Sequence, residues 1–102
     1  MLQSATEAHD MSAFSAVHNY YERLVFEVMA EKELDISEDT YADIACVALN
    51  HLPVVYIRNE LDMMSAHSPR ELMGFRLEVH EAVSDALEFI LYKDRRSRAR
   101  RN

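Results

Sequence analysis

SPRELMGFRLEVHEAVSDALEFIL, residues 68–91, is the most regularly patterned stretch of this chain and predicts a long amphipathic helix. Ser68 is a favoured N-cap, Pro69 suits the first helical position, and Glu71 completes a capping box with the serine. We expect the helix to run from about Pro69 to Asp94. Apolar residues recur along it every three or four positions and so share one face: Leu72, Phe75, Val79, Val83, Ala86, Leu87, Ile90 and Leu91.

Two further helices are predicted upstream. The first runs from about Ser15 to Glu33, and the second from about Glu38 to Asn50, where Ser37 is the expected N-cap. A short helical turn is expected from Glu60 to Ala66. The apolar stripe of the first helix consists of Val17, Tyr21, Leu24, Val25, Val28 and Met29.

The composition favours an all-α domain of three to four helices. The chain has 102 residues, 49% of them hydrophobic, with one glycine and two prolines, too few turn residues for a hairpin-rich fold. We expect a flexible leader at 1–12, one helical domain at 13–94 and a basic tail at 95–102. One cysteine, no signal peptide and no apolar run long enough for a transmembrane segment favour a cytoplasmic location.

The segment after the second helix breaks this helical pattern. Pro53 disfavours helix geometry at the preceding residue, so His51–Asn59 is expected to be an extended, Pro-containing connector. It is too apolar for an ordinary surface loop, and a short strand within it would need a partner. Pairing with the same segment of a second chain is one solution, and we expect a homodimer.

Charge is distributed unevenly. Residues 1–92 carry five basic and seventeen acidic side chains, whereas residues 93–102 carry six basic side chains and one acidic side chain. The acidic body argues against nucleic-acid binding by the folded domain. The arginine-rich tail is the exception, and it is either a solubilising terminus or an arm for nucleic acid or an anionic membrane surface.

The residues with catalytic potential form no recognisable constellation, and we expect no enzyme. Cys46 is predicted to be a buried, inert thiol in the middle of a helix. The histidines show no metal-ligand spacing, and a single glycine cannot make a phosphate-binding loop. No metal site or cofactor is therefore expected.

Two segments instead have the residue types of a binding site. They are His18–Arg23 and Asn50–Arg58, which combine an amide, tyrosine rings and arginines around one proline. Asn50 also suits the left-handed end of a helix, Tyr56 a core position and Arg58 a solvated surface. Together the residues suit a ligand with a flat ring and an anionic group, because rings stack and guanidinium binds phosphate.

The same segments, NYYERLV at 19–25 and DIACVALNHLPVVYIR at 43–58, resemble the late competence development protein ComFB family. The resemblance covers about residues 18–65. It implies a small, dimeric, non-enzymatic bacterial signalling protein linked to competence and pilus or motility behaviour. Some members are receptors for cyclic dinucleotides, especially cyclic di-GMP. Val54 replaces the second proline of the family motif, and Val55 replaces an often basic residue.

We therefore predict a receptor for cyclic di-GMP, with cyclic di-AMP as the other candidate ligand. The alternative is a protein–protein interaction adaptor that binds no nucleotide and docks a downstream partner. The predicted ligand-binding residues are Asn50, His51, Leu52, Pro53, Tyr56, Arg58, Tyr20 and Arg23.

Overall fold

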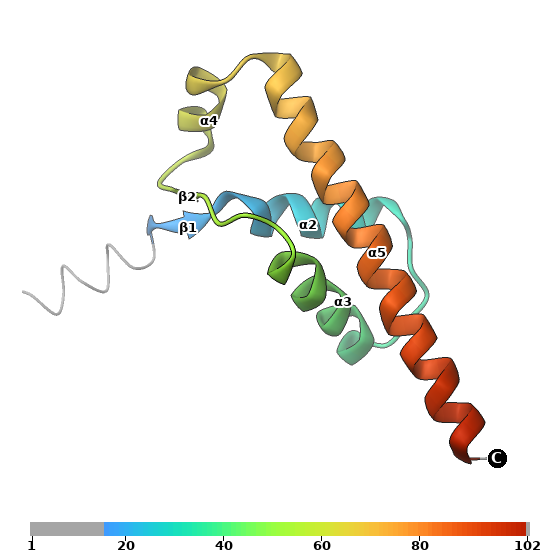
Figure 1. Ribbon diagram of the computed structural model, residues 1–102. Helices are drawn as coiled ribbons and strands as arrows, with labels where there is room; N and C mark the ends of the chain where they lie inside the picture. The colour runs from blue at the N-terminus through green and yellow to red at the C-terminus, as the bar shows by residue number, and fades with distance from the viewer. Residues whose placement is uncertain (1–15, 102) are drawn as a thin grey trace, which may run out of the picture.

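The computed structural model describes residues 16–101, and within them four helices are joined by short connections (Figure 1). The fold is all-α, as predicted, apart from two strands of two residues each. The predicted leader at 1–12 lies outside the described residues. The elements in chain order are β1 (His18–Asn19), α2 (Tyr20–Glu31), α3 (Glu38–Asn50), β2 (Tyr56–Ile57), α4 (Glu60–Ala66) and α5 (Pro69–Arg101).

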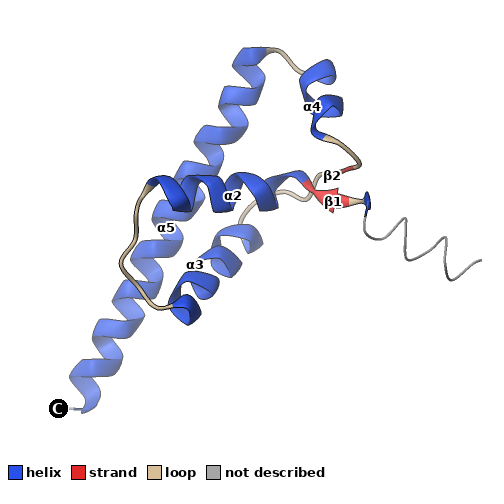
Figure 2. Ribbon diagram, turned by 180° about the vertical axis from the view of Figure 1, so that it is seen from behind, coloured by secondary structure: helices blue, strands red, loops and turns tan. Residues whose placement is uncertain are grey.

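The long helix α5 forms one side of the core. Helices α2 and α3 both lie on the same side of α5 (Figures 1 and 2). Small side chains such as Ala48 and Ala86 lie in the core, which allows α3 and α5 to approach closely. The main buried cluster contains Tyr21, Val25, Val28 and Met29 of α2, Ile44, Ala45 and Ala48 of α3, and Val79, Val83, Ala86 and Ile90 of α5.

Two of the predicted helix starts are confirmed by their caps. The side chain of Ser37 accepts a hydrogen bond from the backbone N–H of Thr40 at 3.1 Å. At the start of α5, Ser68 Oγ accepts from the N–H of Glu71 at 3.2 Å, and Glu71 Oε1 accepts from the N–H of Ser68 at 3.1 Å. This reciprocal pair is the capping box that the sequence predicts.

The predicted start of the first helix is wrong. Helix α2 begins at Tyr20, because Asn19 is its N-cap and has extended backbone geometry. Val17 precedes this cap and is 45% exposed, so it does not belong to the buried stripe. Instead, His18 and the cap residue Asn19 are extended and form strand β1.

The expected connector is present, but the expected pairing is different. Strand β2 pairs antiparallel with β1 of the same chain, with His18 opposite Ile57 and Asn19 opposite Tyr56. The connector therefore has a ladder partner within the chain, and strand pairing gives no reason for a second copy.

The last helix is longer than predicted. Helix α5 continues beyond Asp94 to Arg101 and so includes most of the basic tail. Among residues 16–101, no helix is both long enough and apolar enough to cross a membrane.

Candidate functional site

Asn19 joins the two segments in which the sequence predicts binding residues. Its side-chain Oδ1 accepts hydrogen bonds from the backbone N–H of Tyr21 at 3.2 Å and from that of Val55 at 3.1 Å. The first bond caps α2, and the second holds the connector. The N–H of Tyr20 also donates to the carbonyl oxygen of Val55 at 2.7 Å. The backbone N–H and the backbone carbonyl of Val55 are therefore both bonded to the start of α2, and this fixes the connector there.

The two neighbouring tyrosines of α2 are buried. Tyr20 is 9% exposed and Tyr21 is 2% exposed, and both rings meet Phe75 edge-on with centroids about 6 Å away. Burial raises the pKa of both phenols, with Glu60 adding to the effect at Tyr20 and Glu78 at Tyr21. The side chain of Tyr20, a member of the predicted binding set, therefore packs against α5, beside Ile57 and Met63.

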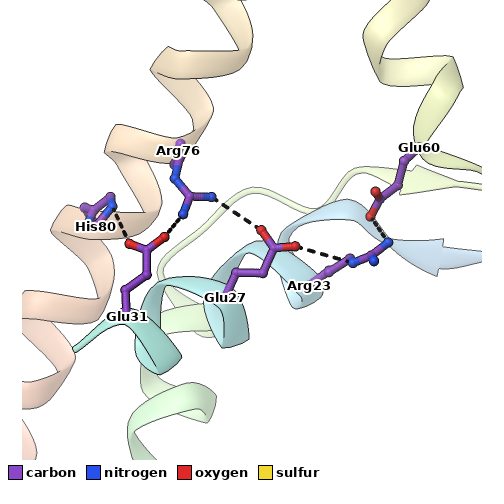
Figure 3. A network of polar contacts seen from close by, with 6 residues as sticks. All are labelled: Arg23, Glu27, Glu31, Glu60, Arg76 and His80. Atoms are coloured by element: carbon purple, nitrogen blue, oxygen red, sulfur yellow. Dashed lines mark hydrogen bonds and ion pairs between the residues drawn. The ribbon is translucent and has the colours of Figure 1, made fainter. Parts of the chain in front are cut away.

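Arg23, another predicted binding residue, takes part in a network of charges that links α2, α4 and α5 (Figure 3). Its guanidinium lies 2.8 Å from Glu60 of α4 and 3.4 Å from Glu27, and Glu60 raises the pKa of the arginine further. Arg76 of α5 pairs with Glu27 and Glu31. Each carboxylate of α2 in this network thus contacts a cation, and the charge of Arg23 is already matched.

Tyr56 and Arg58 lie at the far end of the connector. Tyr56 is 70% exposed, and Arg58 lines a hollow of about 230 Å³ together with Ala16, Asn59 and Asp62. Leu52 is half-buried against the main core, while Pro53 is exposed.

Asn50 and His51 lie elsewhere, in a hollow of about 440 Å³ between α3 and α5. This volume is within the usual range for small-molecule sites. Asn50 is still helical, and His51 is the C-cap, so a left-handed asparagine does not end this helix. The hollow is lined by Val47, Asn50, His51, Ala82, Asp85, Ala86 and Phe89.

His51 is held in a defined orientation at the edge of this hollow. Its Nδ1 lies 2.8 Å from the carbonyl oxygen of Val47. Because a carbonyl only accepts, Nδ1 carries a hydrogen and donates it.

Two lining residues that could contact a ligand, Asp85 and Phe89 of α5, are not among the residues predicted from the sequence. Phe89 is 56% exposed and lies off the apolar stripe of its helix, and this displacement is the signal that could have identified it. Asp85 is one turn away on the same side of the helix. The hollow therefore combines an aromatic face, a carboxylate, an amide and an imidazole, with no lysine or arginine among its lining residues.

Cys46 is exposed, contrary to the prediction of a buried thiol. It faces an apolar groove of about 380 Å³ between α2 and α3, in which Phe26 stacks on Tyr41 with centroids 6.4 Å apart. Small residues on α3 leave this groove open. Within residues 16–101, no three histidine, cysteine, aspartate or glutamate side chains gather as metal ligands would.

These features define a class of protein: a small helical domain with a connector pinned to its first helix and a polar, aromatic hollow between α3 and α5. The chain belongs to the ComFB family, because the family model described as late competence development protein ComFB matches residues 18–93. The match confirms the resemblance seen in the sequence and extends it over most of α5. No curated protein and no solved structure matches the chain.

Proposed function

We propose that this competence-related protein is a non-enzymatic receptor for a cyclic dinucleotide, with cyclic di-GMP as the preferred ligand. The observation that carries the proposal is the hollow between α3 and α5. Asn50 and His51, which belong to the motif of the ComFB resemblance, lie there beside an exposed aromatic ring.

The hollow offers the groups that a guanine base needs. Guanine has N–H donors on one edge, which suit the carboxylate of Asp85, and acceptors at O6 and N7, which suit the amide of Asn50. Its flat face suits the ring of Phe89, since a base stacked on an aromatic side chain gains about 1–3 kcal/mol. Adenine lacks the donor pair that a carboxylate accepts, so this chemistry favours cyclic di-GMP over cyclic di-AMP.

A second copy of the chain completes the proposal. Cyclic di-GMP has two guanines related by two-fold symmetry, and a two-fold homodimer presents two such hollows. The hollow has no lysine or arginine of its own, and Arg58 of the predicted set lines a different hollow. We therefore assign the hollow to the bases and leave phosphate neutralisation to Arg58 from a second copy.

Isothermal titration calorimetry with cyclic di-GMP and cyclic di-AMP tests this function. We expect binding of cyclic di-GMP, weakened by about 5- to 150-fold in Phe89→Ala through the loss of stacking. Leu77→Ala is the matched control, because Leu77 is a 62% exposed apolar residue of the same helix outside the hollow. Absence of heat with either ligand at tens of micromolar refutes the receptor.

The apolar groove between α2 and α3 favours a second candidate, an adaptor that docks a protein partner and binds no nucleotide. Phe26 is 47% exposed in a groove whose lining is otherwise mostly apolar. Pull-down of partner proteins by the unchanged chain and by Phe26→Glu, each with and without cyclic di-GMP, separates the two functions. Capture of a partner that depends on Phe26 and is unaffected by the nucleotide favours the adaptor.

A further inference from the structure

The C-terminal part of α5 extends past the rest of the fold. Among the residues of the helix whose exposure is described, the last buried one is Ile90, and the helix continues to Arg101. Figure 1 shows this end of α5 running on beyond α3, away from the other helices and strands of residues 16–101. The eleven helical residues from Leu91 to Arg101, at 1.5 Å each, form a rod of about 16 Å.

This rod carries a charge opposite to that of the remainder of the chain. Residues 93–101, which we call the basic arm, contain six basic side chains and one acidic side chain. Lys93, Arg95 and Arg96 are all exposed. Successive residues are about 100° apart around a helix, so these three cations face different directions. The guanidinium of Arg96 lies over the ring of Tyr92, 5.9 Å from its centroid.

We propose that the basic arm binds the phosphate backbone of double-stranded DNA without sequence preference. A helix that is basic on several sides fits between two rows of phosphates, as the major groove of B-form DNA is about 12 Å wide and admits an α-helix. Arginine is well suited to this contact because its planar fork donates two hydrogen bonds to one phosphate.

The composition of the arm argues for nucleic acid over a membrane surface. A helix that lies on a bilayer needs an apolar face to enter the acyl region. Ala99 is the sole apolar residue of the basic arm. The acidic body, with seventeen acidic and five basic side chains in residues 1–92, is repelled by phosphate and confines the contact to the arm.

Fluorescence anisotropy with a labelled DNA duplex of random sequence tests the arm in the full chain. Four phosphate contacts would make the affinity fall about 100-fold between 50 and 200 mM salt. The double variant Arg95→Gln, Arg96→Gln removes two contacts and should reduce the slope of log affinity against log salt by about 1.8. Glutamine keeps a good helix propensity, and circular dichroism checks that α5 persists.

The matched control is Lys32→Gln, Arg70→Gln, which removes the same charge from the body and should leave the slope unchanged. Equal slopes for the arm variant and the control overturn the proposal, as does an unchanged chain that shows no duplex binding at 50 mM salt. Tighter binding to vesicles of phosphatidylglycerol and phosphatidylcholine than to the duplex also overturns it.

Discussion

Replacing Asn19 by alanine tests whether one side chain fixes the connector to α2. The change removes two hydrogen bonds, one from the N–H of Tyr21 and one from that of Val55. Loss of an N-cap costs about 1 kcal/mol. A partly buried N–H left without an acceptor costs about 1–3 kcal/mol, and the half-buried Val55 belongs at the lower end. We expect unfolding to become easier by about 2–3 kcal/mol.

For a domain of this size, that loss lowers the melting temperature by about 10–20 °C. Thermal unfolding followed by circular dichroism measures the loss, and hydrogen exchange of the Val55 amide shows whether the connector is released. Asn19→Asp keeps an acceptor oxygen in the same place and should retain most of the stability.

The matched control is Asn59→Ala at the start of α4. Asn59 is also an N-cap, but its side chain accepts a single bond, from the N–H of Leu61 at 2.7 Å. Its loss should cost about 1 kcal/mol or less. Asn19 does not fix the connector if Asn19→Ala lowers the melting temperature no more than Asn59→Ala does, or if the Val55 amide stays equally protected.

Three further predictions concern α5 and its partners. Gly74→Ala should stabilise the protein by about 0.5–1 kcal/mol in urea unfolding, because an added Cβ meets nothing within 4 Å; a lower urea midpoint would contradict this. The pKa of the Tyr21 phenol is raised in the folded protein, so its contribution to the free energy of unfolding is fully present below pH 10. This contribution is lost as pH rises through the raised pKa. Urea midpoints in Tyr21→Phe should show a smaller alkaline decline, since Tyr20 keeps its own raised pKa, and an identical decline would show another cause. Arg76→Gln should cost about 0.5–1 kcal/mol at low salt and less in 1 M NaCl, since its ion pairs are exposed; a salt-independent loss would point to packing instead.

The helices that could be predicted from the sequence are those whose signals are local. Ser37 and Ser68 are N-caps whose side chains bond to a backbone N–H only three residues away. The apolar repeat of α5 is also local, because one face of a helix packs against the core. The wrong start of α2 had a local signal too, because Asn19 precedes an acidic first turn at Glu22. The pairing of β1 with β2 had none, since two-residue strands far apart in sequence carry no pattern of their own.

The candidate site was less predictable, because its residues meet only through packing. Asn50 and His51 were identified from the motif around Pro53, but Asp85 and Phe89 approach them only because α3 lies against α5. The packing also separates residues that are close in sequence. Asn50 and His51 lie at one end of the connector in the hollow, whereas Tyr56 and Arg58 lie at its other end, outside the hollow. Cys46 was predicted to be buried because it adjoins the apolar stripe of α3, whereas the rotation of that helix exposes it.

Chemical-shift mapping of the full chain during titration with cyclic di-GMP tests the central claim most directly. We predict that the amide resonances of Asn50, His51, Asp85 and Phe89 move together and saturate, and that they respond less to cyclic di-AMP. A spectrum that does not change, or changes confined to the surroundings of Tyr56, would contradict a nucleotide site between α3 and α5.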